Sequence, residues 1–386
     1  MKILFFANRM PDMCGAFLHD IDLATELQKR GHTIAFMIIT KPKEGYNGDN
    51  YRGFRFIHYT AATSFLDTSE IWICPHSPIL PTVRKINSRG YYRPIIATCH
   101  FDGNYTAISG NADNRWSEML MFVNKVMQQN YFNNIKPWPS AIVRTETVRP
   151  ILHRNQIVIS EPFRGDYITL VNANLNKGVV QFLDMARAMP NRKFMGVLPY
   201  YGELRVPPAP SNVKWVPFDD DIRVILKQTR ILLMPSFYES FGRIAVESMI
   251  NGIPVIYSTP SENPPHPHYS TEGVQEWIGD AAIACDREKV DEWIAAIESL
   301  DDPDSYASLS KLSRDHIDGM NLFTEASRIA SVVEDFSRQN PAKMMNSGAI
   351  QAAQPVGQSQ PTPVAQRLVA PIGKVGFSSG RLRIQR

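Results

Sequence analysis

The segment RILLMPSFYESFGRIAVESMINGIPVI, residues 230–256, decides the fold class of this chain. An apolar run ending at Pro235 predicts a strand, and the short loop after it carries Glu239 and Gly242. The next stretch has apolar residues at helical spacing, and Pro254 opens another apolar run. A strand, a helix and a second strand in this order predict a parallel β-α-β unit.

The same alternation extends in both directions along the chain, which predicts an α/β protein. Short apolar runs predict strands, and longer segments with helical spacing predict helices between them. Strands are expected at 2–7, 32–40, 54–60, 70–75, 93–100, 166–173, 193–199, 213–218, 230–236 and 253–259, and helices at 17–31, 177–190 and 242–252.

The length of 386 residues and the repeated pattern predict two Rossmann-like domains with a cleft between them. We place the first domain at residues 1–158 and the second at 165–338, with a hinge at 160–165. A helix near 323–336 is expected to close the second domain. Residues 340–386 are rich in Gln, Pro, Ser and Gly, which predicts a disordered tail.

The net charge is too small to indicate nucleic-acid or membrane binding by itself, and the cysteines show no metal-ligand spacing. The formal net charge is +3, and residues 341–386 contain six basic and no acidic residues, so the rest of the chain is mildly acidic. Cys14, Cys74, Cys99 and Cys285 lack the spacing of a metal site, which indicates a reducing, cytoplasmic setting. Cys74 and Cys99 end apolar runs, where we expect small buried side chains. No apolar run reaches the ~18 residues of a membrane span, although peripheral membrane contact stays open.

The loop and helix after Pro235 have the chemistry of a donor-binding site. A helix start offers unpaired N–H groups and partial positive charge, which suit a diphosphate. Gly242 permits close approach of a ligand to the backbone. Glu239 precedes the helix, where its carboxylate can accept bonds from sugar hydroxyls, and Glu247 lies inside the helix, where it can bind a ribose diol.

The segment resembles the E-x7-E signature of retaining glycosyltransferase family 4, whose fold is GT-B. The resemblance covers about residues 1–335 and is strongest in the second half. It implies that Glu239 contacts the donor sugar, that Glu247 contacts the ribose, and that the stretch from Ser240 through Phe241 and Gly242 binds the sugar or phosphate. It also implies transfer from a nucleoside-diphosphate sugar with retention of anomeric configuration.

A second matching element is LVNANLNKG, in which Lys177 and Gly178 correspond to the Lys-Gly that opens a helix in the family. Lys177 would neutralise the leaving diphosphate. The family has an Arg five residues before this Lys, and here that position is Asn172. One charge of the phosphate clamp is therefore missing, and Arg243 is the candidate for replacing it.

Two elements of the first domain complete the expected site. Gly15 and Ala16 follow the first strand, where the family has two glycines that face the diphosphate. His100 ends the strand at 93–100, and the resemblance implies that it points into the cleft beside the donor sugar. Asp102 and Asn104 follow it and are candidates for orienting the acceptor. We predict that His100, Lys177 and Glu239 carry the chemistry.

The run FDDDIR contains Asp219 and Asp221 at the spacing of metal-dependent glycosyltransferases. It follows a predicted strand and opens a helix, where Asp is a common N-cap. We therefore predict a site that uses Lys177 and a helix dipole, with no metal and no cofactor beyond the sugar nucleotide.

Other functions remain compatible with the sequence. A nucleotide-sugar epimerase on the same fold would need no acceptor, and a non-catalytic nucleotide-sugar binder would show no turnover. For a transferase the acceptor is open among a glycan, a lipid and a small molecule. The basic tail adds nucleic acid, as a DNA base, as a weaker alternative.

Overall fold

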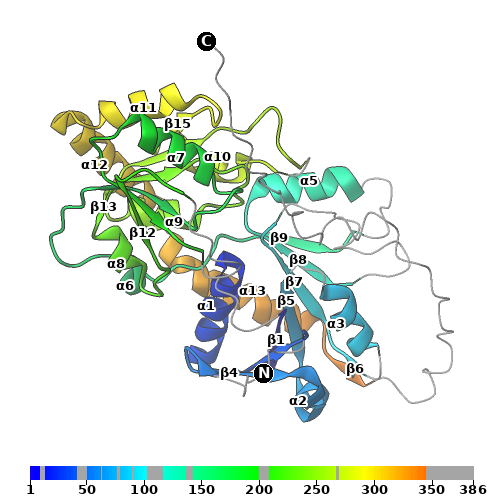
Figure 1. Cartoon of the computed structure of the whole chain (residues 1–386). Helices are drawn as coiled ribbons and strands as arrows, with labels where there is room; N and C mark the ends of the chain where they lie inside the picture. The colour runs from blue at the N-terminus through cyan, green and yellow to red at the C-terminus, as the bar shows by residue number, and fades with distance from the viewer. Residues whose placement is uncertain are drawn as a thin grey trace. The chain divides into compact units, whose positions relative to one another are not determined.

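The computed structural model describes residues 1–8, 14–40, 50–61, 63–75, 79–88, 91–101, 116–135, 142–199, 208–266 and 269–344. Residues 1–344 form one unit, and residues 345–386 lie outside the described part of the chain, so the expectation of a disordered tail is untested beyond 344. The described unit contains two mainly parallel sheets (Figure 1).

The first sheet has eight strands in the order β3-β4-β2-β1-β5-β7-β8-β9, parallel except where β3 pairs with β4. Its apolar central strands are buried on both faces, which is characteristic of parallel sheets. The strands are β1 (Lys2–Ala7), β2 (Thr33–Ile38), β3 (Asn50–Tyr51), β4 (Phe54–His58), β5 (Ile71–Pro75), β7 (Ile95–Cys99), β8 (Met119–Phe122) and β9 (Arg144–Thr147).

Alternate residues of these strands supply two separate cores, because successive side chains point to opposite faces. Phe5 belongs to the core on the side of α1, whereas Phe6 belongs to the core on the side of α3 and α5. Cys74 and Cys99 are fully buried in the second of these cores, as expected. The helices of this half are α1 (Gly15–Lys29), α2 (Thr63–Thr68), α3 (Leu80–Asn87), α5 (Lys125–Ile135) and α6 (Arg154–Ile157), with a 3₁₀ turn at Tyr59–Ala61.

The second sheet has six parallel strands in the order β12-β11-β10-β13-β14-β15. Its order reverses direction at β10 and β13, which places a crevice at the carboxyl ends of these two strands. The strands are β10 (Tyr167–Val171), β11 (Phe194–Val197), β12 (Val213–Val216), β13 (Thr229–Met234), β14 (Val255–Ser258) and β15 (Ile283–Cys285).

Helices cover both faces of the second sheet. Residues of α7 and α11 pack in one core, and residues of α9 and α10 pack in the other. The fold is therefore α/β with two doubly wound sheets. The helices are α7 (Val179–Ala188), α8 (Ile222–Leu226), α9 (Arg243–Met249), α10 (Glu272–Ile278), α11 (Val290–Ser299) and α12 (Pro303–Gly319), with 3₁₀ turns at Gly279–Ala281 and Leu322–Thr324.

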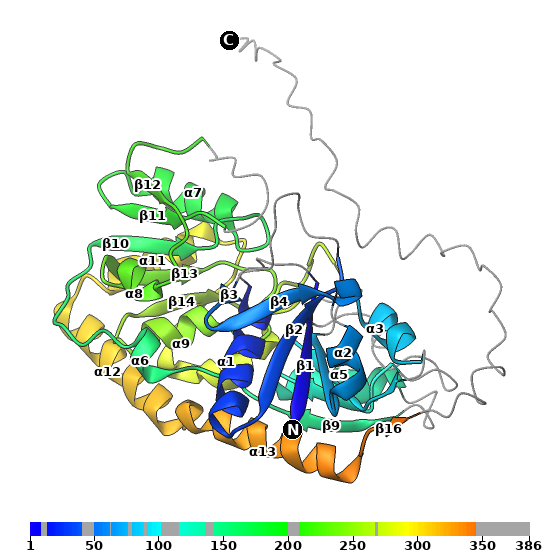
Figure 2. The ribbon, with the colours of Figure 1, turned by 90° about the horizontal axis from the view of Figure 1, so that it is seen from below.

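The last long helix, α13 (Glu325–Gln339), packs with the first sheet, although we expected it to close the second domain. Its buried residues Ile329, Val333 and Phe336 belong to the same core cluster as Phe5 and α1. Figure 2 shows α13 following α12 and lying beside α1. The chain thus returns to its first half, because the apolar face of α13 packs against the core there.

The ordered chain also extends beyond residue 340, where we expected the tail to begin. β16 (Lys343–Met344) pairs antiparallel with β6 (Tyr91–Tyr92), with Lys343 opposite Tyr92. Arg93 adds a hydrogen bond of 3.4 Å from Nη1 to the carbonyl of Lys343. These contacts place the end of the folded part at residue 344, four residues after the expected start of the tail.

Candidate active site

The predicted site residues meet around one cavity of about 510 Å³. The cavity lies at the carboxyl ends of β7, β10 and β13 and at the start of α1, where open α/β sheets place their ligands. It is lined by every residue that the sequence singled out for chemistry or donor binding: Gly15, Ala16, His100, Asn172, Lys177, Glu239, Ser240, Phe241, Gly242, Arg243 and Glu247.

Lys177 and Glu239 form an ion pair inside this cavity. Lys177 Nζ donates to Glu239 Oε1 at 2.6 Å, and Ser236 Oγ donates to the same oxygen at 2.8 Å. Glu239 is 7% exposed, whereas the Lys177 side chain is 28% exposed. An ammonium group has three N–H donors. Lys177 therefore retains donors for a phosphate while it holds Glu239 in place.

The turn that carries Lys177 requires glycine at the next position. Gly178 has φ +82° and caps α7, and a Cβ at this residue would lie 2.1 Å from the carbonyl oxygen of Pro235. Phe237 N–H donates to the carbonyl of Asn176 at 2.9 Å. The loops after β10 and β13 thus lie in direct contact, which brings Lys177 to Glu239.

Asn172, which replaces the arginine expected from the resemblance, has a local structural role. It has φ +63°, a left-handed conformation that Asn tolerates better than most residues. Its Oδ1 accepts a bond of 3.0 Å from Asn174, and Asn174 Oδ1 accepts one of 3.1 Å from the Lys177 amide. Asn172 therefore stabilises the loop that positions Lys177.

Gly242 and α9 position the second acidic residue of the pair. Gly242 has φ +72° and is the N-cap residue of α9, which begins at Arg243. Glu247 lies one turn later, so its carboxylate meets the Arg243 side chain, with 2.9 Å between Arg243 Nε and Glu247 Oε1. Burial raises the pKa of Glu247, and Arg243 offsets part of that shift.

Arg243 was a candidate for binding phosphate, and in the structure its side chain bonds to groups of the protein. Its Nη1 donates to Asp22 Oδ2 at 3.1 Å and to the carbonyl of Ile151 at 3.1 Å. Burial opposes the charge of Arg243, but Glu247 and Asp22 outweigh that penalty and raise its pKa. The guanidinium thus lines the cavity while it bonds to two carboxylates.

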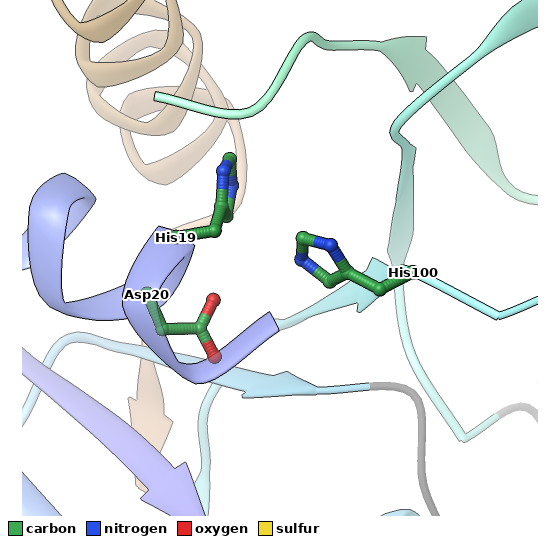
Figure 3. A group of neighbouring side chains, drawn as sticks. All are labelled: His19, Asp20 and His100. Atoms are coloured by element: carbon green, nitrogen blue, oxygen red, sulfur yellow. The ribbon is translucent and has the colours of Figure 1, made fainter. Parts of the chain in front are cut away.

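His100 lies beside two residues of α1 that the sequence reading did not select. Figure 3 shows His19 and Asp20 near His100, and the His19 and His100 ring centroids are 4.8 Å apart. Burial, with His100 and Arg243 adding to it, lowers the pKa of His19 well below its usual value. Burial also raises the pKa of Asp20 to about 8, despite a 3.3 Å bond from Thr98.

His19, Asp20 and His100 each offer one nitrogen or oxygen atom that can bind a metal ion. The ligand atoms lie within 4.8 Å of one another, a limit that includes the separation of about 3.4 Å between neighbouring ligands on a tetrahedral zinc with bonds of about 2.1 Å. His19 Nδ1 accepts the Ile151 N–H at 3.3 Å, so the neutral ring carries its proton on Nε2. The Ile151 amide therefore occupies one ligand nitrogen of His19, and burial favours the protonated form of Asp20.

The Asp219–Asp221 run acts as a helix cap, as expected. Asp221 is the N-cap residue of α8 and accepts a bond of 3.1 Å from the Arg223 amide. Arg223 also pairs with the Asp221 side chain, which lowers the Asp221 pKa. Asp219 lines the cavity and accepts a bond of 2.8 Å from the Asp221 amide.

Several residues that line the cavity or contact its lining were absent from the sequence prediction, and two predicted residues lie outside the described chain. His19, Asp20 and Asp22 are buried on α1, where a cluster of polar residues in the first two turns was an available signal. Arg52, with φ +47°, lines the cavity itself. The acceptor candidates Asp102 and Asn104 lie outside the described residues.

The segment that carries Glu239 and Glu247 is similar to known glycosyltransferases. Residues 209–316 match the family of glycosyl transferases group 1. D-inositol 3-phosphate glycosyltransferase of Corynebacterium kroppenstedtii is 27% identical over 123 residues, which are 32% of this chain and 25% of that protein. The match thus spans a quarter of the curated relative's length.

Solved structures extend the likeness to both domains. Sucrose-phosphate synthase from Thermosynechococcus elongatus superposes with a TM-score of 0.65 at 14% identity, covering 88% of this chain and 98% of that one. Anabaena HepE, solved with UDP and glucose, gives a TM-score of 0.66 at 16% identity, covering 87% and 100%. The chain has the GT-B fold. Within its described residues, no helix has the length and apolarity needed to cross a membrane.

Proposed function

We propose that this chain transfers a sugar from a nucleoside-diphosphate sugar to an acceptor, as a member of retaining glycosyltransferase family 4. The observation that carries the proposal is the Lys177–Glu239 pair of 2.6 Å, which shares one cavity with Gly242 and Glu247. The group 1 match over residues 209–316 supports glycosyl transfer, and the GT-B fold supports a donor site at this crevice.

The chemical step breaks the bond between the anomeric carbon and the diphosphate oxygen, so negative charge grows on the leaving group. Lys177 and the amides at the start of α9 are groups that stabilise such charge without reorganising. Glu239 accepts hydrogen bonds from the donor sugar, and Glu247 accepts them from the ribose. His100 lines the same cavity, and we assign it to the donor sugar. In this assignment the carboxylates bind the donor, and the diphosphate leaves without a metal.

Retention, metal independence and the acceptor belong to the proposal. The acceptor is a glycan, a lipid or a small molecule, and a DNA base is the weaker alternative. Retention rests on the resemblance to family 4, which the E-x7-E spacing of Glu239 and Glu247 carries.

The test begins with thermal unfolding in the presence of UDP, GDP, ADP, CDP and TDP sugars. A donor at 100 times its dissociation constant stabilises the folded state by about 2.7 kcal/mol. The stabilising donor is then incubated with acceptor pools, and NMR reports the anomeric configuration of the product. We expect one base to stabilise the protein and the product to keep the donor's configuration.

Three outcomes would contradict parts of the proposal. No stabilisation by any donor would remove the donor site. Conversion of the donor without an acceptor, into an epimeric sugar nucleotide, would indicate an epimerase. A product of inverted configuration would keep the transferase but reject membership of the retaining family.

A further inference from the structure

Asp22 is a buried carboxylate that lies close to basic side chains from three different segments. It is 1% exposed and lies on α1, and its Oδ2 accepts the 3.1 Å bond from Arg243 Nη1. Its Oδ1 lies 3.6 Å from Arg52 Nη1 and 3.6 Å from His153 Nε2. Burial lowers the pKa of His153, so the two arginines carry the compensating charge near neutral pH.

Arg243 connects this carboxylate to the candidate ribose ligand. Its Nε bonds to Glu247 Oε1 at 2.9 Å, while its Nη1 is shared between Asp22 and the Ile151 carbonyl. The guanidinium is planar and rigid, so fixing one edge of it fixes the other. The position of the Glu247 carboxylate is therefore tied to a residue of the first sheet's helix.

The second carboxylate oxygen of Glu247, Oε2, differs from Oε1 in its contacts. Within the described residues, all recorded bonds to the Glu247 side chain end on Oε1, and the residue lines the cavity. Oε2 is thus available to a hydroxyl of the donor. Whichever group orients Oε1 also determines where Oε2 lies.

Stability alone does not account for this arrangement. A buried ion pair loses most of its Coulombic gain to desolvation, and well-packed apolar residues of similar size are often at least as stable. Arg243 and Glu247 nevertheless line the cavity, and Asp22 is buried in contact with Arg243. Their arrangement has the form expected of a network that holds a binding group in one orientation.

We propose that Asp22 is a positioning residue for the nucleotide: it fixes Arg243, and through Arg243 it orients Glu247 toward the ribose hydroxyls of the donor. This inference rests on the proposed function, because it assumes that a nucleoside diphosphate occupies the cavity. It adds Asp22 to the first-domain residues Gly15, Ala16 and His100, which already line the cavity.

The test measures dissociation constants for a nucleoside diphosphate and for its 2′-deoxy counterpart. The probe is whichever of UDP, GDP, ADP and CDP gives the largest thermal shift with the full chain. In Asp22→Asn we expect the ribonucleotide to bind roughly ten-fold more weakly, as for loss of one bond to a charged group. The 2′-deoxy nucleotide lacks a hydroxyl that Glu247 would bind, so its affinity should fall much less.

A double-mutant cycle separates action through Glu247 from a direct effect. Glu247→Gln should reduce discrimination between the two nucleotides, and adding Asp22→Asn to it should cost less than about two-fold more. The control is Asp318→Asn, which removes an exposed 2.8 Å pair with Arg154 between α6 and α12. It should leave both dissociation constants unchanged.

Equal weakening of both nucleotides in Asp22→Asn would overturn the inference, since a merely structural defect does not select between them. Additive losses in the double variant would overturn it as well. If Asp22→Asn does not fold, Arg243→Lys keeps the charge but loses the shared geometry, and it must show the same loss of discrimination. If Glu247→Gln itself leaves the nucleotide affinities unchanged, or if no nucleotide binds, the proposed donor site fails first.

Discussion

Replacing Lys177 with alanine should reduce the rate far more than it reduces stability. The change removes the 2.6 Å bond to Glu239 and the cation nearest the leaving diphosphate in our assignment. Loss of one preorganised electrostatic contact of this kind typically lowers kcat by about 10²–10³, or about 3–4 kcal/mol of transition-state stabilisation.

The structural cost of the same change follows from what remains around Glu239. Breaking a fully buried pair costs about 3–5 kcal/mol, but Lys177 is 28% exposed, and Ser236 still donates to Glu239 Oε1 at 2.8 Å. Water can replace part of the lost contact, so we expect about 1–2 kcal/mol of destabilisation. Adding Glu239→Ala should restore some stability, because it removes the stranded carboxylate, but it should not restore turnover.

The assay pairs steady-state kinetics on the donor identified by thermal shift with denaturant unfolding of each variant. Lys193→Ala is the matched control, because Lys193 forms an exposed 3.0 Å pair with Asp166 in the same domain. It should leave the rate unchanged. Near wild-type kinetics in folded Lys177→Ala would refute the site assignment, and a rate loss that matches the unfolded fraction would reduce Lys177 to a structural role.

Three further predictions concern the metal, the chain end and a buried acid. Turnover should persist in EDTA, and complete loss that Mn²⁺ or Mg²⁺ restores would contradict a metal-free donor site. A chain ending at residue 344 should hydrolyse donor like the full chain and show a transfer defect, if any, only at low salt. A chain ending at residue 340 should unfold at a slightly lower denaturant concentration, because it lacks the β16–β6 pairing. Equal unfolding midpoints of the two truncated chains would count against that pairing. Asp20 has a folded pKa of about 8 against 3.8 for the free side chain, so the folded state keeps a proton that the unfolded state releases, and stability falls as pH rises from about 4 to about 8. Asp20→Asn should therefore gain stability over wild type by up to about 1.4 kcal/mol per pH unit across that window, and a pH-independent difference between the two proteins would show that Asp20 is ionised when folded.

Much of the donor side of the site was readable from short stretches of sequence. Lys177 and Gly178 follow one strand, and Glu239 and Gly242 follow another, and each pair belongs to a single strand-loop-helix unit. Because parallel strands bring their carboxyl ends to one edge, the local pattern already implied that these loops meet. The same reasoning placed Gly15 and His100 at the corresponding edge of the first sheet, where the cavity is found.

Other features depended on contacts between distant segments. The pattern of α13 predicts an amphipathic helix, but a hydrophobic face does not specify which of two sheets will cover it. Its buried residues pack with α1 in the first half of the chain, although α13 follows the second domain in the sequence. β16 is only two residues long, and its pairing with β6 has no local signal.

The sequence by itself determined the α/β class, the two sheets and the donor loops, because hydrophobic period and turn chemistry act over a few residues. Tertiary structure alone decided the partners of Arg243, which bonds to Asp22 across 221 positions and to Ile151 across 92. It also decided that His100 lies beside the buried residues His19 and Asp20. Such contacts depend on how α1 and α9 approach each other, and the energy of a buried charge depends on neighbours that the linear order of residues does not specify.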